Sequence, residues 1–531
     1  MKSAMTISLS TAVMVACLCA GFATAQSPDI CAPVEQLDKY RYLRQLTLDL
    51  YGRIPTVEEY ERLHMMDDVS NEIIDEMIGS PEFYAQLRRY HRNLLWSNLG
   101  DADLVGQVVQ EEGDDTFRVW VNRGKRDEYR RRDVLCLDME HTNFDAEGRA
   151  LPMFENYTEG VCAGGTGCRM DGWVEVSPYW APGTTIRVCA FDAQPHTDAT
   201  PRDNGDPQSC DRAGDDDPLC GCGPNLNYCT AREDDGNYNA VHEALLEEPA
   251  RVFETVIAAR EPYMNAFSTR STAMNGMLAH FYRYLAGEND SELRNAPDLP
   301  IDADWQAVDR EDYHSGVLTT LGFLRRFASH RARVNRLYTA FLCDPFQAPS
   351  GGLPSATDDC SSNPDLSSRC GCATCHEAIE PATVHWGRWE EGDDFVYQED
   401  INTFSNSCAN CEKDDCSNFC KTFYITRDLE TTPGSVDSEL GKFKVLAWRS
   451  EEEVDALDLG PSALVTRPQY QQQLASCAVR SFAQHVFGRE LSAAEQTGWL
   501  VEKTGNFAAT GHDFLQMVKD VVTDERYRRI E

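Results

Sequence analysis

Five consecutive residues, Cys372-Ala373-Thr374-Cys375-His376, constrain this chain more than any other stretch. A Cys-x-x-Cys-His sequence is the attachment signal of a c-type haem. The two thiols bond covalently to the haem, and the histidine becomes the proximal ligand of the iron. The spacing lets one turn of chain present both sulfurs to the same porphyrin edge. The sequence therefore predicts one covalent haem c on Cys372 and Cys375, with His376 as the proximal iron ligand.

Two other readings of this motif stay open. The cysteines can form an ordinary disulfide that happens to precede a histidine, or they can be a thioredoxin-like redox pair. A redox pair of that kind follows a buried strand and opens a long helix. Residues 367–371 are polar or glycine rather than apolar, and Pro381 is expected to cut the following helix short. Both features favour haem attachment over a redox pair.

The N-terminus predicts export. Lys2 precedes an apolar run that ends in a small-x-small cleavage site at 23–25, so residues 1–25 read as a secretory signal peptide. The expected destination is the periplasm, the outer-membrane surface or the extracellular space. The alternative is a lipoprotein signal with Cys17 as the lipid anchor. No later stretch is apolar over the ~20 residues that a membrane span needs.

Composition limits the partners. The chain has 49 Lys and Arg against 87 Asp and Glu, a formal net charge of −38, which disfavours nucleic acid and favours a basic redox partner protein. Solubility, or adaptation to salt, explains the same charge equally well. The 21 cysteines fit an oxidising compartment.

With 531 residues the chain is too long for one core, and its apolar spacing predicts a mainly α protein of several small helical domains. Capping signals at 56–59, 80–81 and 492–495 mark helix starts, residues 264–285 read as one long helical segment, and residues 184–188 read as a strand. After the signal peptide the expected segments are an N-terminal helical domain (26–105), a Cys-rich irregular or β insertion (106–240), a helical domain (241–345), a cytochrome c-like haem segment with a Cys-rich loop (346–440) and a C-terminal helical domain (441–531).

Four cysteines crowd into the Cys-rich loop of the haem segment. Cysteines this close in sequence can bind Zn²⁺ or an iron–sulfur cluster, or can form two disulfides. The four are Cys408, Cys411, Cys416 and Cys420. In an exported chain disulfides are favoured, so we expect two disulfides here and no metal.

Three stretches resemble one known family. "YRYLRQLTLDLYGRIPTVEEYERL", "CATCHEAIEPATVHWGRWEEG" and "RSFAQHVFGRELSAAEQTGWL" are similar to the N-terminal, haem and C-terminal segments of secreted planctomycete and myxobacterial cytochrome C-associated proteins of unknown function. The resemblance implies the helical fold class and the haem, and it implies no activity. His385-Trp386 replaces an apolar pair of the family pattern, and a Thr-Ser-Pro after His330 is missing.

The sixth ligand of the iron is expected to be a histidine rather than a methionine, because Met517 is the only methionine between His376 and the C-terminus. His330 is the first candidate because of its Ser-His context in a further stretch, "YHSGVLTTLGFLRRFASHRARVNRLYTAFLC", that is also similar to a segment of the family. His385 is the second, since it follows the proximal histidine by only nine residues.

Three functions fit these features. The first is an exported monohaem cytochrome-like protein that binds haem and transfers single electrons. The second is a haem peroxidase or oxidase acting on an extracellular substrate, which needs an open iron position and an acid–base residue. The third is a structural cell-surface protein with ancillary haem. The chain has no G-x-S-x-G, H-E-x-x-H or P-loop signature, so electron transfer is favoured and no catalytic residues are assigned.

The first prediction concerns the covalent bond. Intact-mass measurement after acid–acetone extraction should still show one haem on the protein, because thioether bonds survive a treatment that removes noncovalent haem. Substitution of Cys372 and Cys375 by serine should release the pigment. Full loss of pigment from the unsubstituted protein would contradict the attachment.

Overall fold

The computed structural model describes residues 36–529 apart from 97–106, 123–129, 131–133, 158–167, 182, 197, 202–204, 211–218, 232–238, 290–295, 298, 301, 311–312, 348–358, 393–396, 400, 413–414 and 430–433. The predicted signal peptide and the alternative lipid anchor at Cys17 lie outside the described residues. Helices dominate the described chain, which confirms the mainly α prediction.

The helices fall in three stretches of sequence. The first is α1 (Lys39–Tyr51), α2 (Val57–His64), α3 (Asn71–Ile78) and α4 (Pro81–Leu95); the second is α6 (Asn239–Ala258), α7 (Gly276–Asn289), α8 (Leu321–Arg326) and α9 (His330–Phe341); the third is α10 (Ala373–Thr383), α11 (Asn406–Ala409), α12 (Asn418–Phe423), α13 (Glu451–Val454), α14 (Ala456–Val465), α15 (Pro468–Phe487), α16 (Ala493–Thr497), α17 (Trp499–Ala509) and α18 (Phe514–Val522).

The expected helix signals act as caps. At α2 the Thr56 hydroxyl accepts from the Glu59 amide while the Glu59 carboxylate accepts from the Thr56 amide. At α16 the Ser492 hydroxyl accepts from the Glu495 amide, and the Glu495 carboxylate accepts from the Ser492 amide. Ser80 caps α4 with Pro81 as the first helical residue. These bonds satisfy amides that a helix start leaves without partners, so the predicted boundaries are confirmed.

The Cys-rich insertion is a small, irregular β region. Its strands are β1 (Gln107–Gly113), β2 (Arg118–Asn122), β3 (Phe154–Tyr157), β4 (Cys168–Met170), β5 (Trp173–Val176), β6 (Ile186–Cys189), β7 (Asp198–Ala199), β8 (Gln208–Ser209) and β9 (Cys229–Ala231), of which five form one sheet in the order β5-β6-β2-β1-β9. The predicted strand at 184–188 overlaps β6. Disulfides 136–189, 210–220 and 222–229 staple the region, because its separate apolar clusters are small.

The segment 264–285 is not one helix, contrary to the sequence prediction. A 3₁₀ turn (Tyr263–Phe267) leads into β10 (Ser271–Met274), and only then does α7 begin. β10 pairs antiparallel with β11 (Gln306–Asp309), a partner far along the chain. The side chain of Asn275 then accepts from the Leu278 amide and restarts the helix. Non-local strand pairing has overridden the local helical spacing here.

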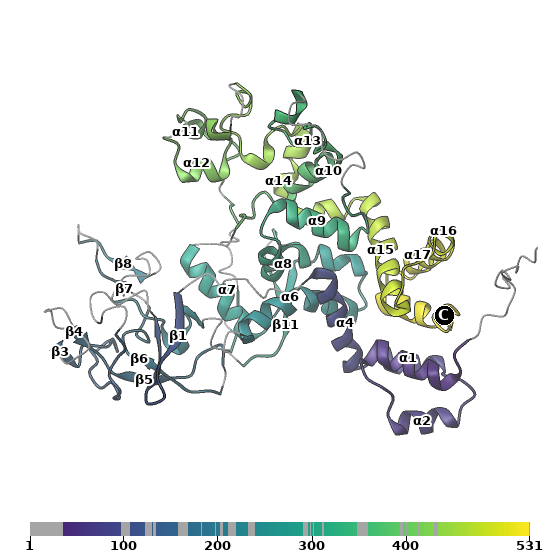
Figure 1. Ribbon diagram of the computed structural model, residues 1–531, viewed down its shortest axis with the longest axis horizontal. Helices are drawn as coiled ribbons and strands as arrows, with labels where there is room; N and C mark the ends of the chain where they lie inside the picture. The colour runs from purple at the N-terminus through teal and green to yellow at the C-terminus, as the bar shows by residue number, and fades with distance from the viewer. Residues whose placement is uncertain are drawn as a thin grey trace, which may run out of the picture.

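One apolar core joins the two ends of the chain. It runs from Tyr42 of α1 to Tyr527 near the C-terminus, and it includes residues of the central helices and one face of the sheet. The Tyr42 hydroxyl donates to the Val522 carbonyl, and Lys519 of α18 pairs with Asp75 of α3 at 2.7 Å. Figure 1 shows α1 beside the C-terminal helices, with the β insertion at the opposite end.

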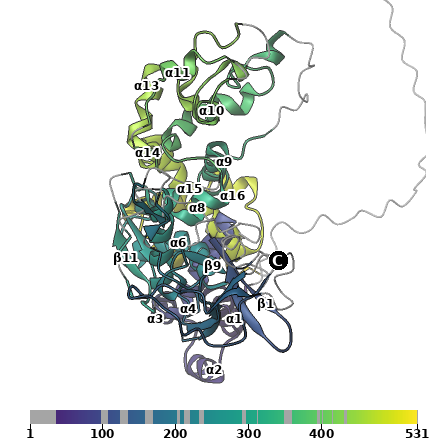
Figure 2. The ribbon, with the colours of Figure 1, turned by 90° about the vertical axis from the view of Figure 1, so that its left-hand side faces the viewer.

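The haem segment stands at one end of the molecule, above α9 (Figures 1 and 2). It shares a second apolar core with α14 and the residues before it, including Val384, Cys420, Phe443 and Leu457. Residues on both sides of the expected boundary at 440 therefore pack together.

The Cys-rich loop is held by two disulfides. Cys408 bonds to Cys420, and Cys411 bonds to Cys416, which confirms that these four cysteines form disulfides.

Among the described helices, none is both long and apolar enough to cross a membrane.

The second prediction uses a disulfide between distant helices. Cys343, just after α9, bonds to Cys477 of α15, a separation of 134 residues. Replacing both by serine should lower the free energy of unfolding by about 2–4 kcal/mol, because the bond restricts a long loop of the unfolded chain. Urea unfolding without reductant measures the loss.

The matched control replaces Cys411 and Cys416, which are only 5 residues apart. That bond closes a short loop and should contribute less. A larger loss for the short-loop pair would contradict this account.

Candidate haem site

Helix α10 presents the whole motif from its first turn. Cys372 is the N-cap residue, and its carbonyl accepts from the amides of Cys375 and His376. This turn places the two thiols three residues apart on the start of a helix. Between 359 and 372 the chain forms turns and a short 3₁₀ segment rather than a strand, which does not match the thioredoxin-like arrangement.

The sequence suggested that Pro381 would cut α10 short, and the structure differs from this expectation. Pro381 lies inside the helix, which continues to Thr383 and then into a 3₁₀ turn at Val384–Trp386. The missing amide removes one hydrogen bond in the last turn, where the helix is about to end anyway.

The two motif thiols are free, and both are partly exposed. The other cysteines of the described chain are all disulfide-bonded. Cys370, two residues before the motif, is bonded to Cys360 and so does not compete for either thiol. Cys375 packs on the main core, and its Sγ lies 3.6 Å from the Gln347 carbonyl.

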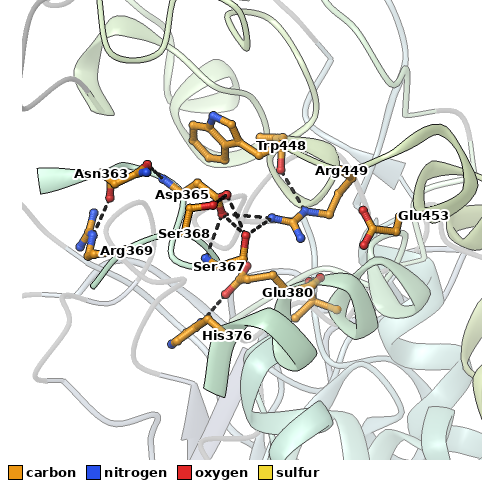
Figure 3. A network of polar contacts seen from close by, with 12 residues as sticks. Asn363, Asp365, Ser367, Ser368, Arg369, His376, Glu380, Trp448, Arg449 and Glu453 are labelled. Carbon is orange, nitrogen blue, oxygen red and sulfur yellow. Dashed lines mark hydrogen bonds and ion pairs between the residues drawn. The ribbon is translucent and has the colours of Figure 1, made fainter. Parts of the chain in front are cut away.

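His376 is held by a carboxylate one helical turn further along α10. Its Nδ1 lies 2.5 Å from Oε1 of Glu380, and Arg331 of α9 holds that same carboxylate through two bonds of 2.7 and 3.2 Å. Glu380 is largely buried, with a side-chain exposure of 14 %. The chain of contacts from α9 through Glu380 fixes the orientation of the imidazole (Figure 3 shows the pair His376–Glu380).

The Glu380 carboxylate is kept ionised. Burial alone would raise its pKa, but the hydrogen bonds and charge of Arg331, with the bond from His376, outweigh burial and lower the pKa below its ordinary value. An ionised carboxylate only accepts hydrogen bonds, so the proton of the shared bond belongs to Nδ1 of His376. In the neutral imidazole the lone pair is then on Nε2.

These residues fit a c-type haem. Two unpaired thiols, spaced for one porphyrin edge, adjoin an imidazole whose Nδ1 is engaged by a carboxylate, which leaves Nε2 of the neutral ring to bind a metal. A hydrogen bond from the other ring nitrogen to a carboxylate is the usual arrangement around a metal-ligating histidine.

His330, the first candidate for the sixth ligand, begins α9 and is buried. Its Nε2 donates to the Trp389 carbonyl at 2.7 Å, and its Nδ1 lies 3.4 Å from Glu391. Burial lowers the pKa of His330 to about 4, so the ring is neutral. Iron binding through Nε2 would require loss of the bond to Trp389.

His385, the second candidate, is also buried and engaged on both sides. Its Nδ1 donates to the Gly460 carbonyl at 2.7 Å, and its Nε2 accepts from Arg467 at 3.3 Å. Burial lowers the pKa of His385 to about 4. Both candidates therefore support the packing around the haem segment, and the identity of the sixth ligand stays a prediction.

A second polar network holds the chain just before the motif (Figure 3). The Asp365 carboxylate accepts from the Ser367 amide and from the hydroxyls of Ser367 and Ser368. Arg449, with 5 % of its side chain exposed, pairs with Asp365 at 3.2 Å. The network ties the turn before Cys372 to the segment after the expected domain boundary at 440.

A scan of protein-family models, a search of curated proteins and a search of solved structures each find no match to this chain. The family resemblance of the sequence thus remains a prediction that rests on the quoted motifs.

Sequence reasoning found the thiols and the histidine but missed the carboxylate clamp. Glu380 follows His376 by four residues, a spacing that brings side chains together on a helix, so this contact was available from the sequence. Arg331 is 49 residues from Glu380, and no sequence signal pairs them.

The third prediction tests the network before the motif. Asp365→Ala should lower the local stability of this turn by about 2–3 kcal/mol, because Arg449 loses its carboxylate partner while it stays buried. Hydrogen exchange of the amides at 363–370 measures the change. Glu412→Gln, an exposed acidic residue of the Cys-rich loop, is the control and should leave exchange there unaltered. Equal exchange in the Asp365 variant and the parent protein would contradict the role of this network.

Proposed function

We propose that this chain is an exported, c-type cytochrome-like protein that binds one haem covalently and transfers single electrons. The observation that carries the proposal is the pair of free thiols in Cys372-x-x-Cys375-His376, set in a described chain whose other cysteines are disulfide-bonded. A haem-attachment site must keep its thiols reduced, whereas the surrounding structure uses oxidised cysteines.

The residues of the site have separate roles in this proposal. Cys372 and Cys375 would hold the haem covalently, so that it is retained when the protein is dilute. His376 would bind the iron through Nε2, with its ring orientation fixed by Glu380. When bound, the haem supplies a one-electron couple, and the protein itself needs to make or break no bond.

Export agrees with the disulfides. The long-range bond between Cys343 and Cys477 and the two bonds of the Cys-rich loop persist in an oxidising compartment. Covalent haem attachment and a predicted signal peptide fit the same route.

The acidic surface supports a basic partner. The net charge of the chain is −38, and exposed Glu377 lies next to His376 on α10. Charges of one sign attract a partner of the opposite sign and raise its rate of association.

The fourth prediction has two readouts on the haem-loaded protein. The optical spectrum should be that of six-coordinate, low-spin iron, since a carrier needs no open iron position. Reduction by a small basic cytochrome in stopped flow should slow steeply as ionic strength rises, because salt screens the attraction.

A neutral small-molecule reductant is the control for the salt effect, and its rate should change little. A five-coordinate, high-spin spectrum with sustained peroxidase turnover would overturn the carrier assignment in favour of a haem enzyme. A salt-independent rate with the basic cytochrome would remove the steering claim alone.

A further inference from the structure

We infer that Glu380, clamped by Arg331, is a positioning residue that gives His376 a partly anionic character and so lowers the midpoint potential of the haem. This inference rests on the proposed function. It concerns residues outside the attachment motif, and it names a carboxylate rather than a neutral carbonyl as the partner of the proximal imidazole.

The geometry supplies the first part of the argument. Nδ1 of His376 lies 2.5 Å from the Glu380 carboxylate, a short distance for a hydrogen bond to a charged acceptor. The contact is between residues of one helix, four positions apart, and so it does not depend on a mobile loop. Arg331 grips both carboxylate oxygens from α9, so the carboxylate cannot easily turn away.

Burial supplies the second part. The side-chain exposure of Glu380 is 14 % and that of His376 is 22 %, so the bond is partly shielded from water. A charge interacts more strongly in such a setting than in bulk solvent. The exposed guanidinium of Arg331 (54 %) offsets only part of the negative charge, because water screens it more.

The consequence follows from charge balance. The oxidised iron carries one more positive charge than the reduced iron, and a negative charge on the proximal side favours the oxidised state. An imidazole that donates strongly to a carboxylate is also a more basic ligand. Reduction takes one electron from the redox partner protein, and the shared proton stays between Nδ1 and Glu380, so no proton is taken up or released.

The fifth prediction compares variants of the haem-loaded, full-length protein. Glu380→Gln keeps the size of the side chain and removes its charge. At a fixed applied potential the ratio of reduced to oxidised haem should rise at least tenfold, which for a one-electron couple is a shift of about 59 mV to higher potential.

Glu377→Gln is the matched control. It removes the same charge from the same helix, next to His376, but Glu377 is exposed. Its potential should shift far less than that of Glu380→Gln. Equal shifts in the two variants would show a general charge effect and would overturn the inference, as would an unchanged potential in Glu380→Gln.

Arg331→Gln tests whether the midpoint potential depends on the charge of the Glu380 carboxylate or only on how tightly that carboxylate is held. It removes a positive charge and leaves the carboxylate, so the potential should fall or stay constant. A rise like that of Glu380→Gln would overturn the inference.

If Glu380→Gln takes up no haem, Arg331→Gln and Glu380→Asp decide the question. Glu380→Asp keeps the carboxylate charge and should keep a low potential. Absence of covalent haem from the unsubstituted protein would instead refute the proposed function.

Discussion

Burial of one large apolar core, with members from α1 to the residues after α18, holds most of this structure together. Residues of α1 pack against the C-terminal helices, and the hydrogen bond from Tyr42 to Val522 joins positions separated by 480 residues. The central helices and one face of the small sheet complete the core. The rest of the β insertion and the Cys-rich loop pack in smaller apolar clusters, and disulfides brace both regions.

The haem segment combines both means of stabilisation. Its own apolar core joins the Cys-rich loop to α14, and the buried Trp386 and Trp389 extend from it into the main core. The Trp386 indole donates to the Leu318 carbonyl, and Arg333 of α9 donates to the carbonyl of Trp389. Helix α10 is thus supported from the side of α9, where the Arg331 contact also originates. The helix that carries the motif is therefore packed against buried residues, although the motif thiols are partly exposed.

Local signals in the sequence predicted local structure well. The capping pairs at 56–59 and 492–495, and the start of α4 at Pro81, depend on residues within one helical turn of each other. The two disulfides of the Cys-rich loop followed from cysteine density and compartment. The helix expected over 264–285 was wrong because β10 pairs with a strand about 35 residues further along, and helical spacing carries no information about such a partner. The same distinction applies to the site, where Glu380 was within reach of sequence reasoning and Arg331 was not.

The bond between Cys360 and Cys370 has a consequence for how such a protein would be matured. Cys370 lies two residues before Cys372, and exchange between thiols and disulfides needs only a nearby thiolate. While Cys370 is unpaired, the oxidants of an oxidising compartment could join it to a motif thiol in a disulfide. If the motif binds haem as proposed, haem attachment and disulfide formation would compete for the same two sulfurs during maturation. Early closure of the Cys360–Cys370 bond would remove the nearest competitor, and the order of these two events would decide the yield of correctly loaded protein.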